Sequence, residues 1–528
     1  ICGNTEDLSS GRIVHDHICR SHLWEHRILR SMVVEMYGKC GAVEDARCVF
    51  ESIRVKTVYS WNIMISVYTQ NECFELALVL FREMVLSEGF EPDKFTLSSA
   101  LAACVDINLL HEGCLIHSKG VDLGLESDIV IGTALLNMYS KCGSLDEAFR
   151  MFNRIQKHDI IAWNAMIAAC VYCHDNKCAL DVFEKLMHQE GVKPNHSTYV
   201  SILRACASMG TNANFSWIHV DIILSGVEMD VVIGTALVSM YSRCGNLELA
   251  ESVFNRMLQR DLVTWNTLLS AYLYYLHSFD TLKFLLQMKL NGIDPDDYTF
   301  SAAIDGCSDL QKGRIIHANI IDAGFEQYSI VGNALITMYS KCGSLDDAEI
   351  SFCRMSNHRT IISWNAMISA YQEHGHSNKA IQLYFQMVDD EEAVPNDITF
   401  ISVLGACGHT GKVKASHMYF KSMREEFKII PSIEHYNCMV DLFGRAGNID
   451  KAVAMIKKMP LHPGTVLLQT LLASCRRCGN VQVARVAFGD VVGFDEMEDA
   501  IYICMYNIYI EAAMQEDANK VELMRARR

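Results

Sequence analysis

The sequence predicts an all-α fold, a right-handed superhelical solenoid of stacked helix-turn-helix repeats. The first indication is a hexad, Met-Tyr-Ser-Lys-Cys-Gly at 138–143, which returns with small changes at 36–41, 240–245, 338–343 and 442–447, in steps of 98 to 104 residues. Two unrelated markers keep the same period. They are a Trp-Asn pair beginning at Trp61, Trp163, Trp265 and Trp364, and a histidine at His15, His117, His219, His317 and His417. A fixed internal period indicates one array rather than several globular domains.

The composition excludes some classes of function. Half of the 528 residues are hydrophobic, yet no apolar run approaches the roughly 18 residues that cross a bilayer. The net charge of −17 disfavours general, charge-driven binding of nucleic acid, although a locally basic groove stays compatible with it. The 21 cysteines recur at repeat positions such as Cys104 and Cys206, which indicates reduced, buried thiols. Ile1 lies inside a repeat, so we expect any targeting segment to lie outside this sequence.

Each interval between hexads divides into three sub-repeats of two short amphipathic helices. One interval comprises residues 129–159, 160–195 and 196–230, with lengths of 31, 36 and 35. In the first, a helix runs through 134–139, Gly143 marks the turn, and Leu145, Ala148, Phe149 and Phe152 form the apolar face of a second helix. The second has helices at 163–167 and 179–187, and the third at 201–206 and around 218–219. A hairpin of this size cannot bury its apolar stripe alone, so neighbouring hairpins must stack.

These sub-repeats resemble the pentatricopeptide repeat family, in particular its plant branch in which P, L and S repeats alternate. The resemblance rests on Ser-Trp-Asn-Ala-Met-Ile at 363–368 for P, on residues 95–97, 103–104 and 116–117 for L, and on Lys-Cys-Gly at 141–143 for S. It implies an array of alternating L, S and P repeats over residues 1–464. It also implies a short E-type C-terminal extension of helical hairpins over residues 465–528.

A fixed place in the first helix of every repeat forms a row along the inner side of such an array. In P-like repeats this place holds the asparagine after the tryptophan, in S-like repeats a small polar residue, and the last residue of each repeat is polar too. We predict that these residues recognise RNA bases in pairs: Ser31 with Thr57, Asn62 with Asp93, Thr133 with Asp159, Asn164 with Asn195, Thr235 with Asp261, Asn266 with Asp296, Asn333 with Thr360, and Asn365 with Asn396, followed by Asn437.

Amides, hydroxyls and carboxylates in a row can read the edges of unstacked bases, one base per repeat. A Thr-Asp pair offers acceptors to the two donors of guanine, and the resemblance implies uracil for Asn-Asp and a pyrimidine for Asn-Asn. The L-like equivalents, Ser98, Val200, Ser301 and Ile401, are left unread. From Arg27 onward the predicted RNA, 5′ to 3′, is n-U-n-G-Y-n-G-U-n-Y-Y-n-Y. Apolar residues three places before the reading position are expected to wedge between bases: Val130, Ile161, Val232, Val263, Ile330 and Ile362.

Simpler roles compete with this interpretation. The last residues of the repeats are of types that cap helices, so they could be N-caps only, whereas the asparagine after tryptophan lies inside a helix. We expect the tryptophans and the recurring histidines to be interior residues. No catalytic residues, metal ligands or cofactor are expected. Two CxxC pairs, at 170–173 and 475–478, lack a second pair, and the His-x-Glu at 188–190 lacks the cysteines of a zinc deaminase.

The resemblance implies a sequence-specific binder of single-stranded RNA in the mitochondrion or chloroplast, with the mitochondrion favoured. It further implies recognition of sites for C-to-U RNA editing. The deaminase would come from a partner docking, with other editing factors, on the C-terminal extension, or from a further C-terminal domain. RNA processing, splicing or stabilisation without editing is a second possibility. A protein-binding scaffold of the tetratricopeptide kind is a third, which the 31/36/35 alternation and the asparagine row disfavour.

Overall fold

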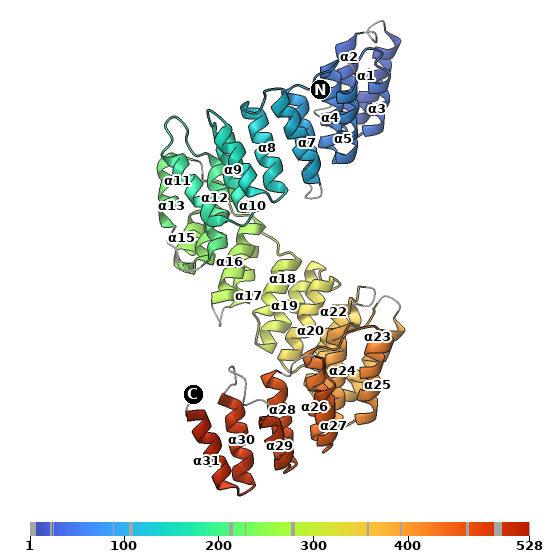
Figure 1. Cartoon of the computed structure of the whole chain (residues 1–528), viewed down its shortest axis with the longest axis vertical. Helices are drawn as coiled ribbons and strands as arrows, with labels where there is room; N and C mark the ends of the chain where they lie inside the picture. The colour runs from blue at the N-terminus through green and yellow to red at the C-terminus, as the bar shows by residue number, and fades with distance from the viewer. Residues whose placement is uncertain are drawn as a thin grey trace. The chain divides into compact units, whose positions relative to one another are not determined.

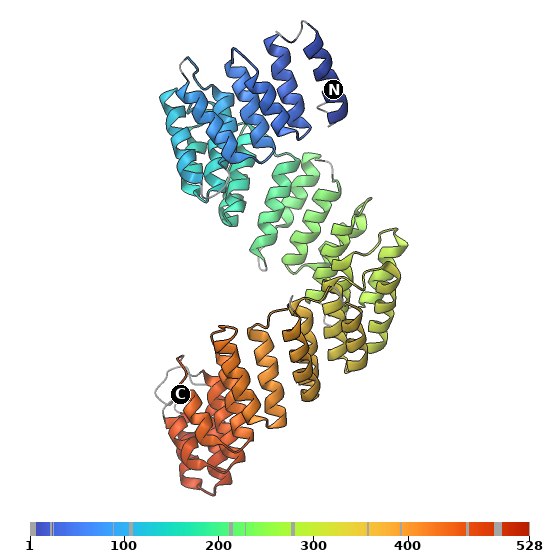
Figure 2. The same ribbon diagram turned by 90° about the vertical axis from the view of Figure 1, so that its right-hand side faces the viewer.

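The computed structural model describes residues 7–526 except 22–23, 25, 88, 105–108, 211–214, 228, 276–279, 356–357, 391–392, 461–463 and 490–498. All regular structure in these ranges is α-helical, which confirms the predicted all-α fold class. The chain divides into two compact units, Ile1–Ala271 and Tyr272–Arg528. Within each unit the helices form hairpins that lie side by side (Figure 1, Figure 2).

The described residues of the first unit form these helices, the last of which runs on into the second unit: α1 (Leu8–Arg20), α2 (Arg27–Lys39), α3 (Val43–Glu51), α4 (Val58–Gln70), α5 (Phe74–Leu86), α6 (Lys94–Ala103), α7 (Leu110–Asp122), α8 (Ile129–Lys141), α9 (Leu145–Arg154), α10 (Ile160–Tyr172), α11 (Asn176–Met187), α12 (His196–Met209), α13 (Ser216–Ser225), α14 (Val231–Arg243), α15 (Leu247–Arg256) and α16 (Leu262–Tyr275). The first helices of successive hairpins pack on one another, as α8 does on α6 and on α10. Helices α8, α10 and α12 begin at the first residues of the three predicted sub-repeats.

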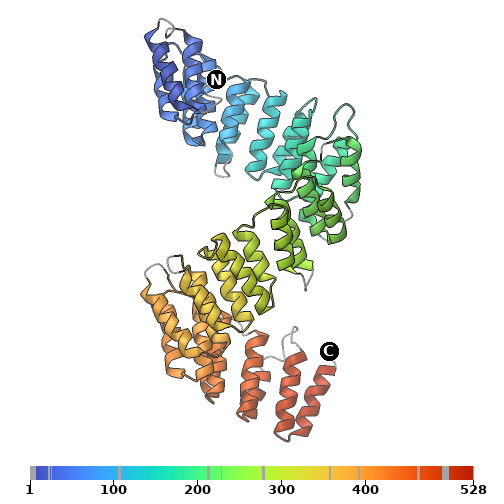
Figure 3. The same ribbon diagram turned by 180° about the vertical axis from the view of Figure 1, so that it is seen from behind.

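The second unit continues with α17 (Thr281–Leu290), α18 (Asp297–Asp305), α19 (Leu310–Ala323), α20 (Ser329–Lys341), α21 (Leu345–Arg354), α22 (Ile361–Glu373), α23 (Ser377–Asp389), α24 (Asp397–Thr410), α25 (Val413–Glu425), α26 (Ile433–Arg445), α27 (Ile449–Lys457), α28 (Thr465–Arg477), α29 (Val481–Gly489), α30 (Asp499–Glu511) and α31 (Gln515–Ala526). Helix α28 packs on α26, and α30 packs on α28 and α31, so the last hairpins extend the same row (Figure 3).

The recurring hexad is the last turn and the stop signal of the first helix in each S-like repeat. In α8 the backbone N–H of Gly143 donates to the carbonyl of Ser140 at 3.0 Å, and that of Ser144 donates to Tyr139 at 2.8 Å. Gly143 adopts a φ of 77°, which glycine reaches without a steric cost. The final glycine of the hexad is therefore required by the turn that reverses the chain.

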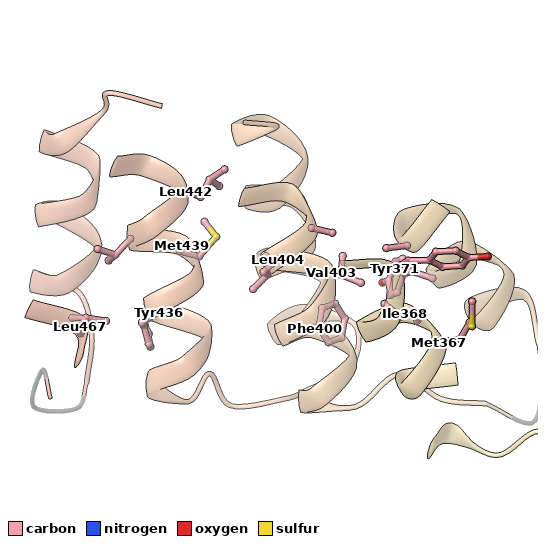
Figure 4. Close-up of a cluster of buried hydrophobic side chains, with 14 of the residues drawn as sticks. Met367, Ile368, Tyr371, Phe400, Val403, Leu404, Tyr436, Met439, Leu442 and Leu467 are labelled. Atoms are coloured by element: carbon pink, nitrogen blue, oxygen red, sulfur yellow. The ribbon is translucent and has the colours of Figure 1, made fainter. Parts of the chain in front are cut away.

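Tryptophans and phenylalanines form the seams between neighbouring hairpins. Trp163 of α10 is 5% exposed and meets Phe152 of α9 edge to face at 4.9 Å between ring centroids. The other three tryptophans of the period are buried against equivalent phenylalanines, which confirms that they are core residues. In the second unit, buried side chains such as Met367, Phe400, Met439 and Leu467 fill the space between α22, α24, α26 and α28 (Figure 4).

The recurring histidines join one hairpin to the next. The Nδ1 atoms of His15, His117, His219 and His317 each form a hydrogen bond with the hydroxyl of the following hexad tyrosine, at 2.8 to 3.1 Å. His317 is buried and the other three are half-buried, in line with the predicted interior position, but the prediction is wrong for His417, which is exposed. His417 is the fifth residue of α25, whereas His15, His117 and His317 are each the eighth residue of their helices, so His417 does not occupy the equivalent position.

We expect acidification to destabilise the array. Burial lowers the pKa of all four of these histidines below their usual value of 6.5, so the unfolded chain binds protons more readily than the folded one. Their stabilising contribution is complete above the unfolded pKa and is lost as the pH falls from there through the lower folded pKa. The melting temperature should therefore fall between about pH 7.5 and pH 5.5. His317→Gln, which cannot titrate, should reduce this dependence, and an unchanged slope in that variant would contradict the assignment.

Candidate nucleic-acid interface

The structure places every predicted reading residue at the fifth position of a first helix. Ser31 lies on α2, Asn62 on α4, Thr133 on α8, Asn164 on α10, Thr235 on α14, Asn266 on α16, Asn333 on α20, Asn365 on α22 and Asn437 on α26. Ser31 and Asn365 are 3% and 7% exposed, whereas the other seven are half-buried.

The last residues of the repeats all stand directly before a first helix. The prediction that they cap these helices is confirmed, because each of them is an N-cap. Thr57, Asp93, Asn195, Asp296, Thr360 and Asn396 form capping boxes with the third helical residue. Asp159 and Asp261 accept from the backbone N–H of that residue at 2.9 and 2.8 Å. Such caps typically contribute about 0.5–2 kcal/mol each.

Three asparagine pairs are joined directly, each between the fifth residue of a first helix and the last residue of the same repeat. The Asn62 side-chain amide donates to Asp93 Oδ1 at 3.0 Å, Asn164 donates to Asn195 Oδ1 at 3.1 Å, and Asn365 donates to Asn396 Oδ1 at 3.0 Å. In Asp93 the same oxygen accepts from the N–H groups of Phe95 and Thr96. In Asp93 the cap and the bond from Asn62 therefore use the same oxygen, Oδ1. Neither of them uses Oδ2.

A threonine completes each of these pairs, and sequence reasoning missed it. Thr96 Oγ1 donates to Asn62 Oδ1 at 2.5 Å, and Thr198 and Thr399 make the same bond to Asn164 and Asn365 at 2.6 Å. The amide is thus held at both ends, which fixes its orientation, yet it keeps one N–H and one oxygen lone pair. The available signal was the capping-box spacing, Asp or Asn followed three residues later by Thr.

The two threonine pairs differ from each other. The Thr235 hydroxyl lies 2.6 Å from that of Thr264, which in turn donates to Asp261 Oδ1 at 2.7 Å. In the other pair Ala162 stands where Thr264 does, and within the described ranges the Thr133 hydroxyl has no hydrogen-bond partner. Among the other fifth-position residues, the Oδ1 atoms of Asn333 and Asn437 are buried and have no hydrogen-bond partner in the part of the chain that the structure describes.

A groove of about 600 Å³ brings the Thr133 pair together with the predicted wedges. Thr133, Asp159, Val130 and Ile161 line it, and Lys141 lies beside them. Lys141 is the basic residue of the hexad and stands two helical turns after Thr133, so it lies on the same face of α8. The groove therefore offers hydrogen-bonding groups, apolar side chains and a cation within one site, despite the acidic balance of the chain.

The predicted wedge residues form part of a longer exposed apolar row. All six are exposed, from 37% for Val130 to 64% for Ile161. They occupy the second position of a first helix, and the same position is exposed and apolar in six further repeats, at Ile28, Tyr59, Phe95, Tyr298, Ile398 and Val466. Water-facing apolar and aromatic side chains at a fixed place beside polar readers suit contact with the flat faces of unstacked bases.

The described residues contain no group of three or more His, Cys, Asp or Glu side chains placed to hold a metal ion. None of the helices in these ranges combines the length and the apolarity needed to cross a bilayer.

Two substitutions of Asp93 should separate what its helix cap and what its negative charge contribute to the free energy of unfolding. Asp93→Ala removes the acceptor for two backbone N–H groups and for the Asn62 amide, so it should lower the free energy of unfolding by about 0.5–2 kcal/mol. Asp93→Asn keeps an acceptor and should cost much less. Urea unfolding followed by circular dichroism measures both variants. An alanine variant as stable as the parent chain would show that the cap contributes nothing.

Models of the pentatricopeptide repeat match this chain in two forms. One, described as the PPR repeat family, matches residues 56–106, 158–208 and 260–309. The other, the PPR repeat, matches residues 133–160, 235–262, 333–359, 362–391, 398–426 and 434–462. Together they cover more than half of the chain.

Whole-chain comparisons agree with these matches. A mitochondrial and a chloroplastic pentatricopeptide repeat-containing protein of Arabidopsis thaliana are each 32% identical over 98% and 99% of this chain, which spans 59% and 64% of their lengths. Among solved structures, maize PPR10 is similar in fold, with a TM-score of 0.57, 19% identity, and coverage of 94% of this chain and 84% of PPR10. PPR10 in complex with an 18-nucleotide psaJ RNA element gives a TM-score of 0.51 at 18% identity and the same coverage. This chain belongs to the pentatricopeptide repeat family.

Proposed function

We propose that this protein binds one sequence of single-stranded RNA, with one base read by each pair of fifth and last residues. The observation that carries the proposal is the asparagine pair found three times with the same geometry, at Asn62, Asn164 and Asn365. In each pair the amide is fixed from within the protein and still has hydrogen-bonding capacity for a base edge. The structural similarity to PPR10, which has been solved with RNA, supports this proposal.

The proposed cellular role is recognition of sites for C-to-U editing in an organelle. The proposal is supported by the resemblance of the repeats to alternating P, L and S repeats and by the presence of helices α28–α31 after residue 464. Relatives named as mitochondrial and chloroplastic support an organelle as the location. The target cytidine would lie a few nucleotides 3′ of the bound stretch. A partner that docks on residues 465–528, or a further C-terminal domain, would supply the deaminase.

The direct test is a binding assay with the predicted RNA and with a version in which both guanines are changed to adenine. Each misread base should cost about 1–3 kcal/mol, so the changed RNA should bind many times more weakly at the same, stated salt concentration. Equal affinity for the two RNAs would contradict base reading at the threonine repeats. No binding to either RNA would favour a protein-binding scaffold instead.

The editing role needs a separate measurement. The transcripts that the protein binds in organelle extracts should carry a cytidine just 3′ of the matching sequence, and that cytidine should be converted to uridine. A bound transcript whose downstream cytidine never changes would favour a role in processing, splicing or stabilisation.

A further inference from the structure

The hydroxyl of Thr264 fixes the direction of the hydrogen bonds at the Thr235 repeat. Thr264 is fully buried at the third position of α16, and its Oγ1 donates to Asp261 Oδ1 at 2.7 Å, because a carboxylate can only accept. A hydroxyl has one proton, so the 2.6 Å contact between Thr264 and Thr235 is a bond that Thr235 donates. The only proton of the Thr235 hydroxyl is therefore directed into the protein.

On the side that faces away from Thr264, the Thr235 hydroxyl can therefore only accept a hydrogen bond. Asp261 uses Oδ1 for its cap and for Thr264, and within the described ranges its Oδ2 has no hydrogen-bond partner. The repeat thus presents two acceptors to a base. Guanine offers two donors on its Watson-Crick edge, N1–H and the N2 amino group, whereas the N1 atom of adenine is an acceptor and would face an acceptor.

The Thr133 repeat has the same two reading residues without this constraint. Asp159 is capped in the same way, by the backbone N–H of Ala162 at 2.9 Å, but Ala162 has no hydroxyl. The Thr133 hydroxyl can therefore rotate, either accepting from guanine or donating to N1 of adenine, while Asp159 accepts from the amino group of the base.

We infer that the third residue of the next repeat's first helix determines how strictly a threonine repeat selects guanine. Thr264 makes the Thr235 repeat reject adenine, and Ala162 leaves the Thr133 repeat tolerant of it. The inference rests on the proposed function, since it assumes that Thr235 and Thr133 contact bases. It assigns a specificity role to a buried residue outside the pairs that sequence reasoning identified.

Three RNAs test the inference: the predicted sequence, and single G-to-A versions at its fourth and seventh positions, which face Thr133 and Thr235. With the unchanged protein, the seventh-position change should weaken binding roughly tenfold more than the fourth-position change, within the range of a single misread base. Thr264→Val, which keeps the shape of the side chain and removes the hydroxyl, should abolish that difference. Thr264→Ser, which keeps the hydroxyl, should preserve it.

The reciprocal variant is Ala162→Ser, which should raise the penalty for adenine at the fourth position and leave the seventh unchanged. If Thr264→Val does not fold, as its thermal melt would show, Ala162→Ser decides the question alone. If Thr264 had a purely structural role, Thr264→Val would weaken binding of all three RNAs by the same factor. An unchanged ratio of the affinities for the G and A versions, in either variant, overturns the inference but not the proposed function. Predicted RNA that binds no better than a scrambled one overturns the proposed function itself.

Discussion

Exchanging Thr133 for asparagine, with Asp159 kept, should move the preferred base of that repeat from guanine to uracil. The variant recreates the pair formed by Asn62 and Asp93, in which the amide occupies the carboxylate oxygen at 3.0 Å. An amide then replaces the Thr133 hydroxyl that accepts from guanine, while uracil gains a matched edge, and each change is worth about 1–3 kcal/mol. Affinities for RNAs with G or U at the fourth position measure the shift, which should exceed tenfold in the ratio of the two.

The control for this exchange is Thr133→Ser, which keeps the hydroxyl and should keep the preference for guanine. Asn62 is also held by Thr96, whereas the equivalent residue after Thr133 is Ala162, so adding Ala162→Thr should sharpen the new preference. If guanine remained preferred in the asparagine variants, the assignment of repeats to bases would be displaced by at least one position.

The largest loss of stability is expected from Trp163→Ala. Trp163 is 5% exposed and packs against Phe152, so the smaller side chain leaves a cavity and should cost about 3–5 kcal/mol. Its indole Nε1 is buried with no hydrogen-bond partner among the described residues, so Trp163→Phe loses no hydrogen bond and should cost much less.

Urea unfolding measures the cost of both tryptophan variants. Hydrogen exchange should show the alanine variant opening first in α9 and α10, because each hairpin of an array depends mainly on its neighbours. An alanine variant within about 1 kcal/mol of the parent would mean that the seam relaxes to fill the cavity.

Much of the fold could be predicted from the sequence because its signals are local. The cap residue before a first helix is its neighbour in the sequence, and the starts of α8, α10 and α12 coincide with the first residues of the 31/36/35 sub-repeats. The prediction of an interior histidine fails at His417. The histidines were expected inside the array from their spacing alone, but His417 is the fifth residue of α25, whereas His317, which bonds to Tyr339, is the eighth residue of α19.

The candidate site was only partly predictable, for a related reason. The reading residues and their partners could be found by period, but the partner that orients each amide comes from the next repeat, 34 residues away in the case of Asn62 and Thr96. Capping and reading looked like competing explanations of Asp93. The structure makes them compatible, because the cap uses Oδ1 and leaves Oδ2 outside these bonds. Base recognition itself stays a prediction.

The hydrogen-bonded cluster of Asn62, Asp93 and Thr96 has a consequence for protein engineering. Because its members come from two successive repeats, a repeat cut out at its own ends would carry only part of the cluster. Chimeric arrays should therefore be spliced after the first turn of the following helix. A cassette of two successive repeats, from α4 to the end of α7, keeps this cluster intact.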